Sequence, residues 1–98
     1  MITSKQRAKL RSLATKIEPI IQIGHKELSE NLLMQIDGAL ETRELVKISI
    51  LQSADVDGKS LVNELASVLR AEPVASIGSK MVLYRKSRKT GVKHIELD

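Results

Sequence analysis

The chain has 98 residues, a length that indicates one domain able to bury a core without disulfides or metal ions. It contains no cysteine, which excludes disulfides and thiolate metal sites, and its apolar runs are too short to predict a membrane span. The net charge of +4 is segregated, with basic ends (residues 1–26 and 73–98) around an acidic middle, a pattern typical either of polyanion binding or of solvated surface.

The first predicted element is a short helix that begins after Thr3 and ends near Lys16. Thr3 and Gln6 have the spacing of a capping box, and Pro19 disfavours helix in the residue before it. Apolar residues recur at helical spacing at Leu10, Leu13, Ala14 and Ile17. The basic residues spread over the remaining surface of this helix: Lys5, Arg7, Lys9 and Arg11.

A strand, a glycine turn and a helix are predicted between Pro19 and Leu40. The apolar run Pro19–Ile23 is typical of a central strand, and Gly24 permits either a positive φ or the close approach of another molecule. Ser29 is a good N-cap, and apolar residues follow it at helical spacing: Leu32, Leu33, Ile36, Ala39 and Leu40. Because free N–H groups begin the helix, this turn is suited to binding a phosphate.

The rest of the chain predicts a strand, then a helix, and then a two-stranded hairpin. The predicted ranges are a strand at 45–51, a helix at 59–70, and hairpin strands at 74–77 and 81–85 around Gly78. Gly38 lies inside the second helix, and a close helix–sheet contact is the usual reason for such a residue. The basic tail, 86–98, is expected either to add a short edge strand or to stay mobile.

These elements predict a single α/β domain over residues 1–98 in the order αβαβαββ. The expected architecture is a four-stranded mixed sheet with its helices packed against one face. The first two strands should be parallel, because a helix connects them.

Catalytic and metal-binding patterns are absent from the sequence. His25 and His94 are far apart, and the glycines form neither a P-loop nor a dinucleotide fingerprint. The acidic residues of the second helix are interpreted as a solvated stripe: Glu30, Asp37, Glu41 and Glu44. We therefore expect no enzyme, no cofactor, no metal and no small-molecule substrate.

The only aromatic residue, Tyr84, is expected in the core or on the surface of a strand. One aromatic side chain cannot supply the stacking platform on which many modules hold single-stranded bases. Any nucleic-acid recognition should therefore use phosphates, backbone N–H groups and shape.

Three segments resemble the CRM domain family in its single-domain, YhbY-like bacterial form. They are TSKQRAKLRSLA, then IEPIIQIGHKELSENLLMQIDGALETRELVKISIL, and finally VASIGSKMVLYRKS. The resemblance covers nearly the whole chain and implies a fold similar to the C-terminal domain of translation initiation factor 3. It also implies association with pre-ribosomal particles of the large subunit through rRNA.

The family carries a GxxG loop between the first strand and the second helix. Gly24 matches the first glycine of that motif and His25-Lys26 the variable pair, whereas Glu27 stands in place of the second glycine. A carboxylate repels a phosphate, so Glu27 either weakens the loop or points outward and does little.

We predict a cytoplasmic, monomeric RNA-binding protein that assists maturation of the large ribosomal subunit. The predicted RNA-binding residues are Gly24, His25, Lys26, Lys5, Arg7, Lys9, Arg11, Arg85, Lys86 and Arg88. The alternative is an adaptor that grips a basic ribosomal protein through the acidic side of the second helix, with Asp37, Glu41 and Glu44.

Overall fold

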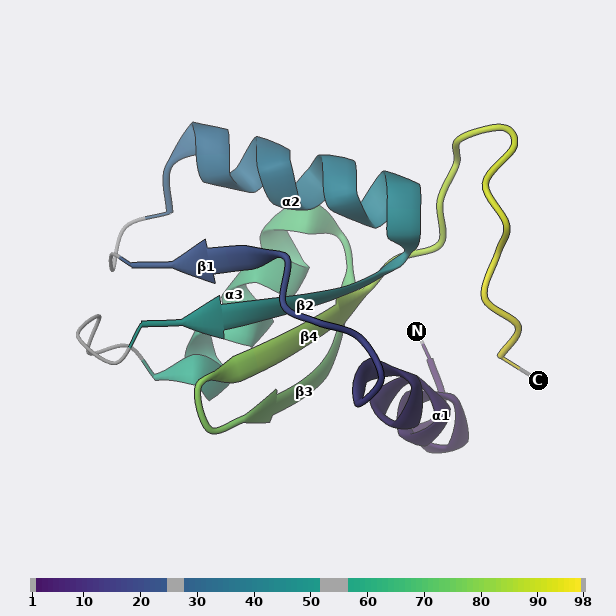
Figure 1. Cartoon of the computed structure of the whole chain (residues 1–98), viewed down its shortest axis with the longest axis horizontal. Coiled ribbons are helices and arrows are strands. Elements are labelled where there is room, and N and C mark those ends of the chain that lie inside the picture. The colour runs from purple at the N-terminus through teal and green to yellow at the C-terminus, as the bar shows by residue number, and fades with distance from the viewer. Residues whose placement is uncertain (1, 25–27, 52–56, 98) are drawn as a thin grey trace.

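The computed structural model describes residues 2–24, 28–51 and 57–97, and within them it contains three helices and four strands (Figure 1). The elements are α1 (Ser4–Ala14), β1 (Ile21–Ile23), α2 (Glu30–Arg43), β2 (Leu45–Ile50), α3 (Gly58–Leu69), β3 (Glu72–Ile77) and β4 (Lys80–Tyr84). This order, αβαβαββ, confirms the prediction. None of the helices among the described residues is long and apolar enough to cross a membrane.

The four strands form a mixed sheet in the order β1-β2-β4-β3. β1 is parallel to β2, and β4 is antiparallel to both of its neighbours. Gly78 has a φ of 57°, as the first central residue of a tight hairpin turn between β3 and β4 requires. Pro73 is tolerated because β3 is an edge strand with a register shift between Pro73 and Ala75.

Side-chain capping fixes where each helix begins. Thr3 accepts a hydrogen bond from the Gln6 N–H and completes the predicted capping box, and Ser29 accepts one from the Leu32 N–H. At the start of α3 the Asp57 carboxylate accepts from the Lys59 N–H. Each cap satisfies a backbone donor that the first helical turn leaves free.

The main hydrophobic core lies between the sheet and the pair α2 and α3. Alternate residues of β2 point into it, with Val46 and Ile48 fully buried, as the predicted alternation requires. The innermost helical residues are Ile36 and Leu40 from α2 and Leu65 from α3.

Helix α1 packs on the opposite face of the sheet, so the prediction that all helices share one face was wrong. Leu10 and Ala14 contact a second cluster that contains Leu45, Val82 and Tyr84, the β2 and β4 residues that alternate with the main core. In Figure 1, α1 lies beside the end of the sheet where β4 finishes, and the hairpin end is not covered by it. A sheet with apolar residues on both faces needs cover on both.

The C-terminal segment is neither an edge strand nor detached from the domain. Ile95 and Leu97 pack against the same cluster as α1, and Ser87 is buried. This segment runs beside the end of α2 and returns toward α1 (Figure 1). The expected edge strand is therefore not formed over residues 86–97, and the apolar and polar groups of this segment have partners elsewhere in the domain.

Gly38 is exposed, and a Cβ atom placed on it would meet nothing within 4 Å. The expected close helix–sheet contact was therefore wrong. A glycine inside a helix costs about 1 kcal/mol relative to alanine. We expect Gly38→Ala to raise the free energy of unfolding by about 1 kcal/mol, measured by urea denaturation. A decrease would contradict the open space seen at this position.

Candidate nucleic-acid interface

The basic residues of α1 lie in two rows on either side of the buried apolar stripe. Arg7 and Arg11 are one helical turn apart on the side toward β3, and Arg7 Nε donates to the Pro73 carbonyl at 3.2 Å. Lys5 and Lys9 form the other row and are exposed. The four predicted residues are therefore all at the surface of α1, but they do not share one face.

Lys47 was missed as a site residue, although the alternation of β2 placed it opposite the main core. Its Nζ donates to the carbonyl of Ala14 at 3.2 Å and lies 3.5 Å from that of Ile17. Ala14 is the last residue of α1, where the helix dipole favours a cation, and Ile17 follows in the connection to β1. Lys47 thus ties β2 to α1 and adds positive charge to the face that α1 covers in part.

A hollow of about 330 Å³ lies between α1 and the uncovered part of the sheet. Its floor is apolar and its border is basic. It is lined by Arg11, Ser12, Ala14, Thr15, Lys47, Ala75, Ile77, Lys80 and Val82. We call it the α1–sheet groove. Its described lining contains three cationic side chains and no carboxylate, so it is electrostatically suited to an anionic ligand.

Gly24 follows β1 and does not have a positive φ. A Cβ atom there would lie 3.0 Å from Leu51 Cδ1, so close packing explains the glycine. A hollow of about 320 Å³ beside it is lined in part by the polar residues Ser29, Asn31 and Gln35, near the N-terminus of α2. His25 and Lys26, the predicted phosphate-contacting pair, lie outside the described residues.

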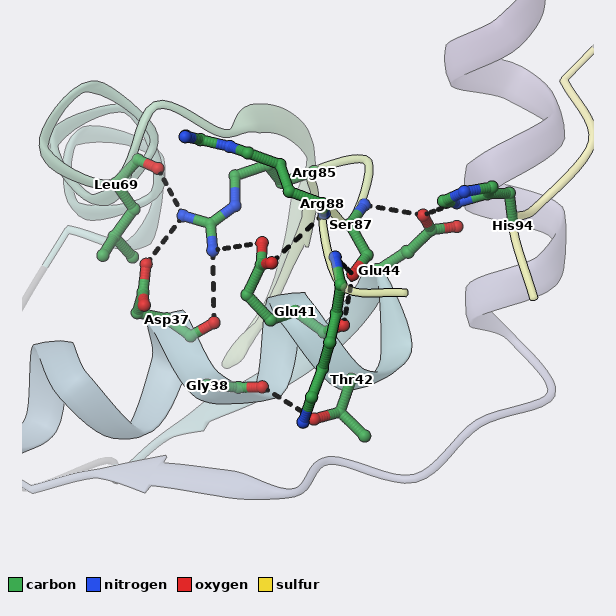
Figure 2. Close-up of polar contacts among 11 residues, drawn as sticks. Asp37, Gly38, Glu41, Thr42, Glu44, Leu69, Arg85, Ser87, Arg88 and His94 are labelled. Carbon is green, nitrogen blue, oxygen red and sulfur yellow. Dashed lines mark hydrogen bonds and ion pairs between the residues drawn. The ribbon is translucent and has the colours of Figure 1, made fainter. Parts of the chain in front are cut away.

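Arg85 is placed inside a network rather than on a free surface (Figure 2). Its guanidinium donates to Asp37 at 2.8 Å, to Glu41 at 3.0 Å and to the Leu69 carbonyl at 2.8 Å, and its side chain is only 12% exposed. This cation holds α2 against the end of α3. We therefore leave Arg85 out of the candidate interface.

Glu44 forms the second centre of this network and is fully buried. Its carboxylate accepts from the Ser87 N–H at 2.7 Å and lies 2.6 Å from Nδ1 of His94 (Figure 2). It also accepts from the Ile95 N–H at 2.8 Å. The interpretation of the α2 acids as a solvated stripe was wrong for Glu44. It caps α2 at a φ of 66° and fastens the C-terminal segment.

Lys86 and Arg88 are exposed on this fastened segment. The Arg88 N–H donates to Glu41 at 3.1 Å, and the Ser87 hydroxyl donates to the Glu41 carbonyl at 2.6 Å. The hydrogen bond thus fixes the Arg88 backbone, although Arg88 as a whole is exposed to solvent. Lys86 and Arg88 therefore remain candidates for RNA contact on a positioned segment.

Burial opposes ionisation of Glu44 and would raise its pKa, but its contacts with His94, Ser87 and Ile95 outweigh burial and lower the pKa. Because this pKa is lower in the folded chain, the stabilisation is complete above the unfolded value, about 4.3, and is lost as pH falls through the folded pKa. We expect acid to release the segment bearing His94 and Ile95. The protection factor of the Ile95 amide, which corrects for the intrinsic slowing of exchange in acid, should therefore fall between about pH 6 and 3.

Tyr84 is buried beside Leu10 and Val82, as expected for a core residue. Burial, and then the negative charge of Glu44, raises the pKa of its hydroxyl. Tyr84 is therefore not available as a platform for a base. Among the described residues, no group of three or more His, Asp or Glu side chains is arranged to hold a metal ion.

Comparison with known proteins places this geometry in a family. The CRS1 / YhbY (CRM) domain model matches residues 2–85. YqeI of Bacillus subtilis, named a probable RNA-binding protein, is 40% identical over 97 residues, with 99% of each chain covered. A Haemophilus influenzae protein named RNA-binding protein is 32% identical and covers 94% of this chain and 93% of its own.

A solved structure has the same fold over its whole length. The solution structure of the hypothetical protein SAV1595 from Staphylococcus aureus, described as a candidate RNA-binding protein, superposes with a TM-score of 0.82. It is 47% identical, and all of both chains is covered. The fold and the family are thus supported over the full chain.

Proposed function

The chain belongs to the CRS1/YhbY (CRM) domain family, and from this membership we propose that it binds structured RNA through phosphate contacts. The observation that carries the proposal is the basic surface of α1, where Lys5, Lys9 and Arg11 are exposed. Lys47 and Lys80 extend the positive charge across the neighbouring sheet face. Cations at this density release counterions from RNA, which supplies most of a sequence-independent affinity.

We further propose that the RNA is rRNA of the assembling large subunit and that the protein acts in the cytoplasm without catalysis. The support is the family resemblance, together with relatives named as RNA-binding proteins. The basic surface explains general affinity for RNA, whereas preference for one rRNA region would come from its shape.

The adaptor alternative is not carried forward, because the acidic side of α2 is used within the fold. Asp37 and Glu41 pair with Arg85, and Glu44 is buried against the C-terminal segment. A basic protein partner would have to displace these internal contacts. All three acidic residues are therefore engaged within the domain, although the side chain of Asp37 remains 53% exposed.

The experiment that tests the proposal is a binding titration against fragments of large-subunit rRNA, with an unrelated structured RNA of the same length as control. We expect tighter binding to at least one rRNA fragment. Equal binding to all RNAs would leave general RNA binding and overturn the rRNA assignment. No binding to any RNA at low salt would overturn the proposed function.

Replacing Glu27 by glycine tests the predicted phosphate-binding turn. Glu27→Gly removes a negative charge three residues after Gly24 in the sequence and restores the GxxG pattern. We expect the affinity for RNA to rise about threefold, the size of one exposed charge interaction of about 0.6 kcal/mol. Glu64→Gln, which removes one negative charge from the surface of α3, is the control. Equal effects of both variants would contradict a specific role for this turn.

A further inference from the structure

We propose that the α1–sheet groove, bordered by Arg11 and Lys80, holds one unpaired nucleotide of the bound RNA. The inference rests on the proposed function and adds a second contact surface to α1. The base would lie on the apolar floor, and its phosphates would meet the cations at the border.

The floor of the groove is an uncovered part of the sheet. Ala75, Ile77 and Val82 come from the paired strands β3 and β4 and face the side on which α1 packs. Ile77 is 70% exposed, which is unusual for a large apolar side chain in a strand. An apolar surface of this kind gains free energy when a flat ligand covers it.

The size of the hollow favours a small ligand over a segment of protein. Its volume of about 330 Å³ lies at the lower end of the range for small-molecule sites, roughly 300–1,000 Å³. RNA-binding modules commonly hold single, splayed-out bases, usually against aromatic side chains or arginine guanidinium planes. An aliphatic floor provides contact but not aromatic stacking, so we expect little preference for a particular base.

The charges around the groove match the backbone of that nucleotide. Arg11 of α1 and Lys80 of β4 are exposed, and both line the groove together with the apolar floor. Lys47 of β2 adds a third positive charge while its Nζ donates to the Ala14 carbonyl. The described lining holds no carboxylate that would repel a phosphate. Two exposed cations around an apolar floor are complementary to a phosphate–base–phosphate unit.

The pairing of the strands connects the groove to the predicted phosphate-binding turn. Ile77 pairs with Lys80, Lys80 with Ser49, and Ser49 with Gln22, so one row of residues crosses the sheet. Gln22 is the central residue of β1, and Gly24 follows directly after the end of that strand. A strand of RNA lying along this row would reach from α1 to the Gly24 turn without leaving the protein surface.

The test compares binding to two RNAs that share the same stem sequence. One is a hairpin with an unpaired uridine loop, and the other is a blunt duplex without a loop. We expect Ile77→Ser to weaken hairpin binding about fivefold, through lost apolar contact, and to leave duplex binding unchanged. Lys80→Ala should reduce the slope of log affinity against log salt concentration for the hairpin by about one, the equivalent of one lost phosphate contact. Thermal unfolding of each variant verifies that it folds.

Matched controls come from α3, on the other face of the sheet. Val68→Ser removes another exposed apolar side chain, 56% exposed against 70% for Ile77, and Lys59→Ala removes an exposed lysine. If the wild type binds the hairpin and the groove variants behave like these controls, the groove inference is overturned and the proposed function stands. The same holds if Ile77→Ser weakens the duplex and the hairpin equally. If the wild type binds neither RNA, the proposed function itself fails.

Discussion

Reversing the charges of Lys9 and Arg11 should lower the affinity for structured RNA about 100-fold at moderate salt. Each reversal removes an attraction of about 0.7 kcal/mol and adds a repulsion of the same size. Together these two changes weaken the affinity about tenfold per residue. Both residues are exposed and belong to different rows of α1. The double variant Lys9→Glu/Arg11→Glu therefore tests both flanks of the helix, with fluorescence anisotropy as the readout.

The matched control carries the same change of net charge on the opposite face of the sheet. Lys59→Glu/Arg70→Glu places both reversals at the ends of α3, where both residues are exposed. We expect this variant to lose less than about fivefold in affinity, through long-range repulsion alone. Comparable losses in both double variants would mean that net charge, and not the α1 surface, decides binding.

Replacing Glu44 by glutamine should lower the free energy of unfolding by about 2–3 kcal/mol. The carboxylate accepts two backbone N–H groups and contacts His94, and bonds to a charged acceptor are worth about 1.5–3 kcal/mol. Glutamine keeps the size of the side chain but presents one acceptor oxygen, and its amide would face donors. Urea denaturation at neutral pH measures the loss.

The effect of Glu44→Gln should also diminish with acidity, since a protonated Glu44 loses the same charge. We expect the difference between wild type and variant to shrink as the pH falls through the lowered pKa of Glu44. Glu64→Gln, on the exposed side of α3, should change stability by less than about 0.5 kcal/mol at any of these pH values. A loss that stays constant down to acid pH would contradict the role assigned to the Glu44 charge.

Local sequence patterns were sufficient to predict the elements of the fold. The capping residues Thr3 and Ser29 and the alternation of β2 depend on neighbours in the chain, and the structure confirms them. The hairpin at Gly78 is likewise encoded by the turn itself. Such features are readable because the interactions that determine them span only a few residues.

Long-range contacts could not be predicted in this way. Glu44 is separated from Ile95 by 51 residues and Arg85 from Asp37 by 48, so no local spacing marks either contact. In the sequence, Glu44 resembles the exposed acids of α2, and Arg85 resembles the basic tail. Burial and pairing, which depend on the tertiary fold, reverse both interpretations.

The candidate interface was predictable in part. The exposed cations of α1 follow from helical periodicity, whereas Lys47 and Lys80 join them only through the sheet order. A signal was present, because Lys47 and Ser49 alternate with the core residues of β2 and therefore had to face the other side. The sequence patterns did not indicate that α1 packs on that side of the sheet.

RNA binding through phosphate contacts of the basic α1 surface is tested most directly by the salt dependence of the affinity. Affinity of the wild type for one rRNA fragment should be measured from about 50 to 200 mM salt. About five phosphate contacts predict a loss of roughly two decades over this range, and a shallower slope for Lys9→Glu/Arg11→Glu. An affinity that is independent of salt, or an identical slope in the double variant, would contradict the account.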